Sequence, residues 1–146
     1  MIFSDIEVLE CSLNDIRKVV EKVIPLIENH RIILLNGDLG SGKTTFSQTL
    51  LKHLGVESPV TSPTFNLVNE YRNSKDELIY HFDLYRIKHL EELEEIGFTE
   101  YLDSGKICLI EWPEIALPLM QSNVLSISIE HHANSRIYKL MSGIEN

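Results

Sequence analysis

The sequence predicts an α/β protein in which helices flank a mixed, mostly parallel sheet and antiparallel hairpins extend that sheet. Three observations favour this fold. Apolar residues 32–35 lead into a glycine-rich loop, after which a helical pattern starts at Lys43. A second apolar run, residues 107–110, ends on Glu111, as a central strand would. Residues 125–130 alternate apolar and polar side chains, which is typical of a strand in an antiparallel pair.

The first half of the chain is expected to contain two helices. Residues 12–24 carry apolar side chains at helical spacing, with Ser12 as the expected cap and Pro25 as the expected end or kink. A second helix is expected over residues 43–54, directly after the glycine-rich loop. The prolines and hydroxyl side chains of residues 58–64 favour a loop.

The second half of the chain is expected to be richer in strands. Two strands, residues 65–71 and 78–84, should flank a polar turn. A short acidic helix follows at residues 89–96, and its glutamates are expected to form a solvated face. The central strand is expected over residues 106–112, and a last strand, residues 136–141, should pair with the alternating segment before it.

Residues 37–44, with the sequence GDLGSGKT, match the pattern G-x-x-x-x-G-K-[ST] of loops that surround nucleotide phosphates. Glycines let such a loop curl until its backbone N–H groups converge at the N-terminus of the next helix, where the helix dipole favours anions. Lys43 is expected to reach the β- and γ-phosphates, and the Thr44 hydroxyl to ligate Mg²⁺. The loop therefore predicts a P-loop NTPase-like fold. A glycine-rich turn without a ligand is disfavoured by the flanking strand and helix.

Length, composition and charge narrow the possible functions. A chain of 146 residues fits a single domain, residues 1–146. No segment approaches the length of a membrane span, no signal peptide is evident, and the two cysteines are far apart, so we expect a cytoplasmic protein with reduced thiols and no membrane partner. The formal net charge of −9 opposes direct binding to nucleic acid, so any RNA is expected to contact another subunit.

Two acidic residues are candidates for the metal site. Glu111 ends the apolar central strand, and Asp83 ends a more polar strand. Acids at the carboxyl ends of strands in open α/β sheets can hold Mg²⁺ directly or through water. Either residue, taken alone, could equally be a surface carboxylate.

Two further positions could take part in phosphoryl transfer. Thr64 could belong to a loop that becomes ordered around a γ-phosphate, with Thr61 and Ser62 as rivals. Arg86 could stabilise charge that develops during the reaction, or pair with a neighbouring acid.

Four motifs in order resemble the TsaE family, the bacterial ATPases of tRNA threonylcarbamoyladenosine biosynthesis. They are the phosphate loop at 37–44, SPTF at 62–65, HFDLYR at 81–86 and EWPE at 111–114. The last three are more specific than the first, and the resemblance spans nearly the whole chain. The resemblance implies a small cytoplasmic P-loop ATPase that uses ATP and Mg²⁺. It also implies that the protein works with TsaB and TsaD and contacts tRNA only indirectly, through that complex.

The resemblance also implies roles for single residues. Carried over by position, phosphate is held by Lys43 and by the amides of Leu39, Gly40, Ser41, Gly42, Thr44 and Thr45. Thr44 and Glu111 ligate Mg²⁺, Asp83 joins them through the metal shell or the attacking water, and Thr64 serves a mobile loop. The implied catalytic set is Lys43, Asp83, Glu111 and Thr64. Trp112 and Glu114 border the nucleotide pocket, Arg136 closes its far side, and Ile16 stands where many relatives carry threonine.

Several functions remain open from the sequence. The leading hypothesis is an ATPase of low intrinsic activity that supports multiple turnovers of a tRNA-modifying assembly. A nucleotide-gated binding module that needs no hydrolysis is the main alternative. A small-molecule kinase is a further one, although the few arginines do not cluster as in a kinase lid. A GTPase is disfavoured because the chain has no Asn-Lys-x-Asp motif.

Overall fold

Seven strands form one sheet in the computed structural model, with the order β1-β7-β6-β2-β5-β4-β3. The structure describes residues 1–38, 40–61, 63, 67–121 and 123–144. The four central strands are parallel: β6 (Val124–His132), β2 (Ile32–Asn36), β5 (Ile107–Glu111) and β4 (Leu78–Asp83). Antiparallel strands extend the sheet on both sides: β3 (Val68–Arg72) beside β4, and β7 (Ser135–Ile144) and β1 (Ile2–Ser12) beyond β6. This arrangement confirms the predicted mixed sheet with a mostly parallel core.

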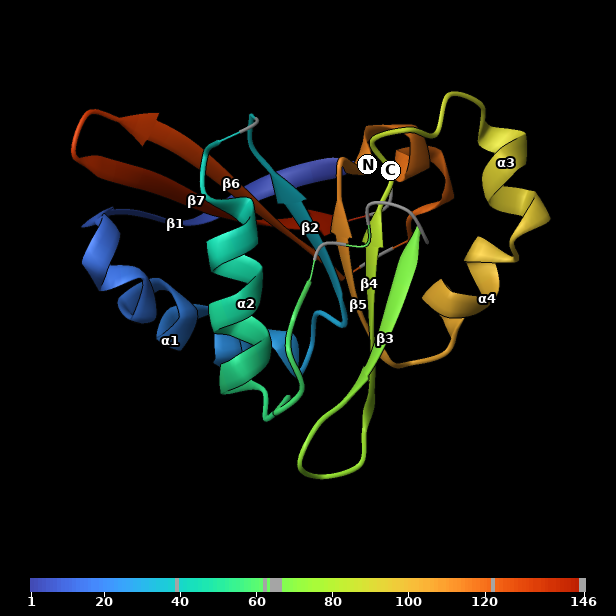
Figure 1. Ribbon diagram of the computed structural model, residues 1–146. Helices are drawn as coiled ribbons and strands as arrows, with labels where there is room; N and C mark the ends of the chain where they lie inside the picture. Colours follow the sequence, from blue (N-terminus) through green and yellow to red (C-terminus); the bar gives the residue numbers. More distant parts are fainter. Residues whose placement is uncertain (39, 62, 64–66, 122, 145–146) are drawn as a thin grey trace.

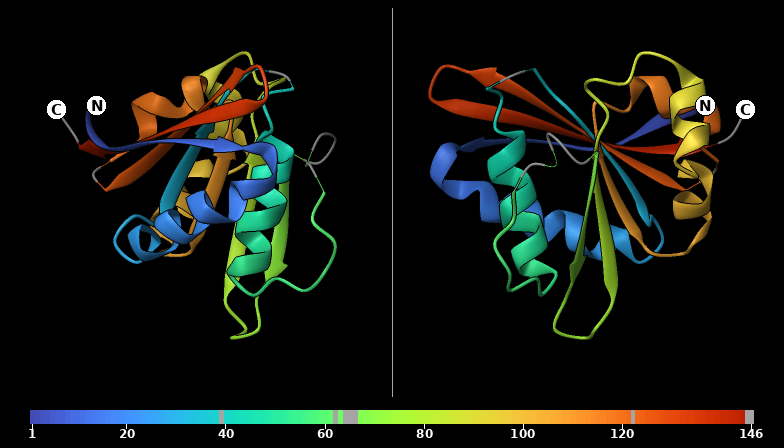
Figure 2. Two further views of the ribbon diagram at one scale, coloured as in Figure 1. Left: turned by 90° about the vertical axis from the view of Figure 1, so that its left-hand side faces the viewer. Right: turned by 45° about the vertical axis from the view of Figure 1, so that its right-hand side comes forward.

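Helices cover both faces of the sheet (Figures 1 and 2). One face carries α1 (Ile16–Ile27) and α2 (Lys43–His53), and the other carries α3 (Leu90–Glu95) and α4 (Phe98–Asp103). Successive residues of β2 pack in the cores on opposite faces of the sheet, because side chains alternate along a strand. Ile33 and Leu35 pack under α1 and α2, whereas Leu34 packs in the opposite core. No helix in the described part of the chain is long and apolar enough to cross a membrane.

The first helix differs from its predicted bounds at both ends. A 3₁₀ turn, Leu13–Asp15, comes first, and the Ser12 hydroxyl donates to Asp15 Oδ2 at 3.2 Å, so Ser12 does not cap a helix amide. At the other end, α1 continues through Pro25 to Ile27. Pro25 is exposed, whereas Ile27 is buried in the core, so packing of the last turn outweighs the missing backbone donor.

One strand and one α-helix were not expected from the sequence. β1 is an edge strand paired with β7 along its length, and it carries exposed Ile6 and Val8 between acidic residues. Other side chains of this strand are partly buried against the two cores: Phe3, Leu9 and Cys11. The six-residue helix α4 buries Phe98 and is too short to show a helical period.

The remaining elements lie close to their predicted positions. Within the predicted strand 65–71, β3 begins at Val68, and residues 65–66 lie outside the described part of the chain. The helix α3 stops before Gly97, whose φ of 70° suits glycine. A 3₁₀ helix, Pro113–Leu119, follows β5, and the C-terminal strands β6 and β7 are longer than the sequence predicted.

Candidate nucleotide site

The glycine-rich loop connects the end of β2 to the start of α2, as the sequence predicted. Gly40 and Gly42 have φ values of 79° and 109°, a region that side chains other than glycine rarely enter. The Ser41 N–H donates to the Asp38 carbonyl at 3.0 Å, and the Phe46 N–H to the Gly42 carbonyl at 2.9 Å. The amides that precede Phe46 belong to the first helical turn, which has no intrahelical acceptors. The loop therefore presents backbone donors at the positive end of a helix dipole. Leu39 lies outside the described residues.

Lys43 is the first residue of α2, and its side chain is buried beneath the loop. Its ammonium forms no hydrogen bond with any described residue and lies 3.5 Å from the centroid of the Trp112 ring. Burial lowers the pKa of Lys43 from its usual value of 10.5, while the nearby carboxylates of Glu111, Asp83, Glu114 and Asp38 act to raise it. A buried cation without a hydrogen-bond acceptor is costly, so this site is suited to receive an anion.

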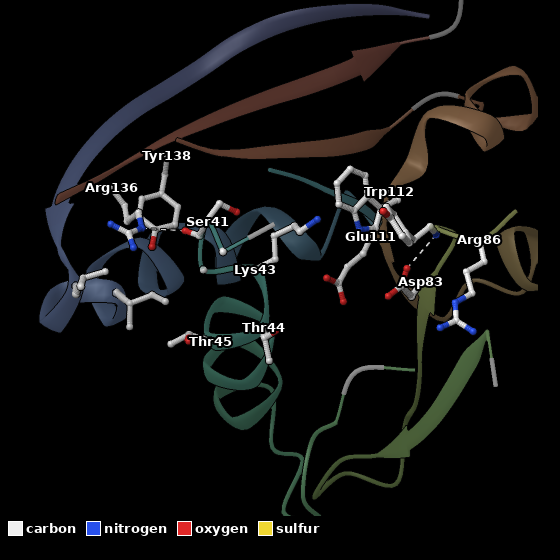
Figure 3. Close-up of a pocket in the computed structure, with 15 residues that line it drawn as sticks. Ser41, Lys43, Thr44, Thr45, Asp83, Arg86, Glu111, Trp112, Arg136 and Tyr138 are labelled. Carbon is white, nitrogen blue, oxygen red and sulfur yellow. Dashed lines mark hydrogen bonds between the residues drawn. The ribbon is translucent and has the colours of Figure 1, made fainter. Parts of the chain in front are cut away.

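Two carboxylates face Lys43 from the ends of neighbouring parallel strands (Figure 3). Asp83 and Glu111 end β4 and β5 and are partners in the register of this pair. Asp83 Oδ1 accepts the Tyr85 N–H at 3.0 Å. Glu111 is 4% exposed and accepts a hydrogen bond of 2.7 Å from His81. Both predicted acids thus lie at the same edge of the sheet as the phosphate loop.

A cavity of about 750 Å³ lies along the glycine-rich loop and reaches α1 and β7 on one side and the ends of β4 and β5 on the other. Its walls include Leu13, Ile16 and Tyr138 at one end and Tyr85 and Trp112 at the other. Apolar and aromatic walls with a few convergent polar groups are typical of small-molecule sites. The volume and the lining are suitable for a nucleotide whose phosphates point to Lys43.

Arg136 connects the loop to the distant strand β7. Its Nε donates to the Ser41 carbonyl at 2.9 Å, and the side chain is 8% exposed (Figure 3). The guanidinium therefore holds the peptide unit that directly precedes Gly42. This contact orients the loop backbone from a strand 95 positions away in the sequence.

Most of the residues selected from the sequence line this one cavity. They are Gly40, Ser41, Gly42, Lys43, Thr44, Thr45, Asp83, Glu111, Trp112 and Arg136, and Arg86 joins them. Glu114 lies instead in an adjoining hollow of about 490 Å³, which shares Gly40, Ser41 and Trp112 with the main cavity. Thr64 and Ser62 lie outside the described residues, as does most of the motif at 62–65.

Four further residues of the site were not selected from the sequence: Leu13, Tyr85, Tyr138 and His81. Tyr85 and His81 belong to the HFDLYR motif, so the spacing of that motif was the available signal. His81 is two positions before Asp83 on β4 and therefore shares its face of the sheet. Leu13 and Tyr138 had no local signal, because long-range strand pairing brings them to the loop. Tyr138 lies on β7, which pairs with β6 beside β2, and Leu13 follows β1, which pairs with β7.

The oxygen ligands available here fit Mg²⁺. This ion is usually held by one or two carboxylates together with phosphate oxygens and water. The Thr44 hydroxyl and the carboxylates of Asp83 and Glu111 all line the cavity beside Lys43. Because the buried ammonium of Lys43 has no acceptor among the described residues, the group that completes the site is expected to bring anionic oxygens.

A phosphate-type loop between a parallel strand and a helix, with acids at the neighbouring strand ends, defines a P-loop α/β protein with the features of a nucleotide site. Residues 11–138 match the family "Threonylcarbamoyl adenosine biosynthesis protein TsaE". The chain belongs to the TsaE family.

Individual relatives agree with this assignment. The tRNA threonylcarbamoyladenosine biosynthesis protein TsaE of Haemophilus influenzae is 39% identical over 127 residues, which are 86% of this chain and 80% of the relative. The protein of the same name from Aquifex aeolicus is 38% identical over 135 residues, 91% of this chain and 96% of the relative. The crystal structure of YdiB from Bacillus subtilis is similar with a TM-score of 0.66 and 25% identity, covering 93% of this chain and 86% of that one.

Proposed function

We propose that this protein is the ATP-binding and ATP-hydrolysing component of the machinery that makes N6-threonylcarbamoyladenosine in tRNA. In this proposal the chain is one ATPase domain that acts with the TsaB–TsaD complex in the cytoplasm and supports multiple turnovers. The observation that carries the proposal is the buried ammonium of Lys43, which has no hydrogen-bond acceptor among the described residues and faces two carboxylates across an open cavity. The names of the relatives support the pathway.

The first step is the binding of the triphosphate. The amides of the loop and of the first turn of α2 donate to phosphate oxygens, and Lys43 neutralises part of their charge. The contact from Arg136 to the Ser41 carbonyl keeps this backbone in place before the ligand arrives. Donors that are already held in position need little reorganisation during the reaction. This preorganisation is the main source of electrostatic catalysis.

The second step is attack by water on the γ-phosphorus, which forms a P–O bond as the bond to the β,γ-bridging oxygen breaks, so that ADP leaves and the water becomes part of inorganic phosphate. Mg²⁺, when bound, neutralises charge on the phosphate oxygens, and Thr44, Glu111 and Asp83 are the residues that would hold it. Asp83 acts through the metal shell or by orienting the attacking water. Thr64 is proposed to supply a hydroxyl from a loop that responds to the γ-phosphate.

The charge of the chain agrees with an indirect role toward tRNA. A formal net charge of −9 disfavours contact with a phosphate backbone, so the partner proteins are proposed to bind the tRNA. ATP binding and hydrolysis here would then change how this chain engages the complex.

Binding measurements test the site. We expect Lys43→Ala to weaken ATP binding by at least about 100-fold while the fold is kept, because a charge-assisted contact to phosphate is lost. Lys52→Ala is the matched control, since Lys52 is an exposed lysine of the same helix that does not line the cavity. Unchanged ATP affinity in Lys43→Ala would refute the site, and tighter binding of GTP than of ATP would refute the choice of nucleotide.

A nucleotide-gated binding module uses the same geometry, because the residues that hold phosphate act whether or not hydrolysis follows. Glu111→Gln separates the two functions, since the amide keeps the shape of Glu111 but removes its charge. If hydrolysis is required, this variant should support one round of tRNA modification and then stop. Repeated rounds at the wild-type rate without ATP hydrolysis would favour the binding module.

The pathway has a separate test in cells. Cells depleted of the protein should lose threonylcarbamoyladenosine from tRNA, and a normal level would refute the pathway.

A further inference from the structure

His81 and Glu111 form a buried contact beneath the proposed metal site. His81 Nε2 lies 2.7 Å from Glu111 Oε2, and the two side chains are only 2% and 5% exposed. They project from the adjacent parallel strands β4 and β5. Glu111 ends its strand, so its second carboxylate oxygen remains available to the cavity that it lines.

The contact defines which nitrogen of His81 carries the proton. An ionised carboxylate only accepts hydrogen bonds, so Nε2 must donate. In the neutral ring Nδ1 is then an acceptor, and it forms no hydrogen bond with any described residue. The hydroxyl of Ser47 is buried and without a described partner as well. Both side chains border a narrow gap beside Thr44 and Glu111 that has no room for a water molecule.

The buried contact between His81 and Glu111 is not explained by stability alone. A buried acceptor without a partner costs about 1–3 kcal/mol, and burial of a carboxylate such as that of Glu111 is also unfavourable unless hydrogen bonds compensate for it. His81 lies among core positions on the α2 side of the sheet: Ile79, two positions before it, and Leu109, its register partner on β5, both belong to the apolar core beneath α1 and α2. Stability therefore does not explain a histidine at this position, whereas a hydrogen bond that Glu111 needs for its function does.

We propose that His81 is a positioning residue that holds one oxygen of Glu111, so that the other oxygen faces the phosphate loop and Mg²⁺. This inference rests on the proposed function, in which Glu111 serves the metal. A hydrogen bond from a second side chain restricts the rotation of a metal-ligating carboxylate and so fixes the direction of its free oxygen. The geometry assigns this task to the Nε2–H group of His81, with no contact between His81 and the nucleotide.

A pair of amide variants tests the proposal. The Nε2 atom of glutamine is three bonds from Cβ, like Nε2 of histidine, whereas the nitrogen of asparagine is two bonds from Cβ and matches Nδ1. Mg²⁺ should strengthen ATP binding in the wild type, and we expect the factor by which it does so to be about 10–100-fold smaller in His81→Asn. In His81→Gln this factor should be close to the wild-type value. Affinity for ATP in excess EDTA should be the same in both variants and in the wild type. His53→Asn, at an exposed position on α2, is the matched control.

A second measurement does not depend on nucleotide. In the ligand-free protein the Nε2–H proton of His81 should give a slowly exchanging NMR signal that persists in the wild type and is lost in Glu111→Ala. Circular dichroism and thermal unfolding check the fold of every variant.

The outcomes separate this inference from the proposed function. Equal loss of ATP affinity with and without Mg²⁺ in His81→Asn would show a merely structural role and overturn the inference. So would wild-type Mg²⁺ dependence in that variant, or an unchanged proton signal in Glu111→Ala. Failure of the wild type to bind ATP at all would overturn the proposed function, and this inference with it.

Discussion

The ammonium of Lys43 lies 3.5 Å from the ring centroid of Trp112, the only tryptophan in the sequence. The two residues come from different elements: Lys43 begins α2, and Trp112 directly follows β5. Trp112 has φ 54° and ψ 57°, a left-handed conformation that is unfavourable for a bulky side chain. The face of the aromatic ring attracts the Lys43 ammonium, as an anionic group would, through a cation–π contact.

This contact predicts a fluorescence signal. Phosphate should draw the Lys43 ammonium away from the ring, so the intrinsic fluorescence of Trp112 should change when Mg-ATP is added and saturate with the binding isotherm. Lys43→Met should show no ATP-dependent change. A signal that is equally large in Lys43→Met would mean that the ring senses another part of the ligand.

Lys43 is also predicted to be unfavourable for stability. Burial lowers its pKa, so the unfolded chain holds the proton more tightly than the folded protein does. As pH falls from 10.5 to the lower folded pKa, the wild type should lose stability relative to Lys43→Met, and below that window the difference should stay constant. At pH 7 we expect Lys43→Met to unfold at a temperature no lower than the wild type, because the lost cation–π contact is worth only about 0.5–2 kcal/mol. A clear drop in the melting temperature at pH 7 would contradict this prediction.

Arg136 is predicted to act on the shape of the phosphate loop. Arg136→Lys keeps the charge but loses the Nε donor to the Ser41 carbonyl. A hydrogen bond from a charged donor contributes about 1.5–3 kcal/mol, so ATP affinity should fall by roughly 10–100-fold. Isothermal titration calorimetry measures this change, and Arg17→Lys, an exposed position on α1, is the control. Wild-type affinity in Arg136→Lys would show that the loop holds its shape without this contact.

The two cysteines are predicted to differ in reactivity. Cys108 is fully buried in β5, and desolvation raises the pKa of its thiol to about 12, whereas Cys11 is partly exposed on β1. Since the thiolate is the reactive form, iodoacetamide at pH 8 should alkylate Cys11 and leave Cys108 unmodified until the protein is denatured. The raised pKa of Cys108 also means that stability is lost as pH rises from 9 toward 12. Mass spectrometry of the native protein checks the labelling, and rapid modification of Cys108 would contradict the buried position.

Local patterns in the sequence were sufficient for the phosphate loop and for both acidic strand ends. The loop needs glycines, a lysine and a hydroxyl within eight residues of the chain, and the order of apolar runs places them between β2 and α2. Asp83 and Glu111 could be selected because each ends a strand, and carboxyl ends of parallel strands share one edge of a sheet. These requirements act over a few residues and are therefore visible in one sequence.

Contacts between distant segments were decided by the tertiary structure. The register of β4 on β5 brings Asp83 level with Glu111 and sets His81 beneath it, while the pairing of β7 with β6, which lies beside β2, brings Arg136 to the Ser41 carbonyl. No periodicity encodes such contacts, because they depend on strand order and on burial against helices from elsewhere in the chain. The sequence alone thus determined which groups are available for binding phosphate and metal. Packing of the sheet determined which of those groups meet, since side chains from different strands are brought together only when the core forms.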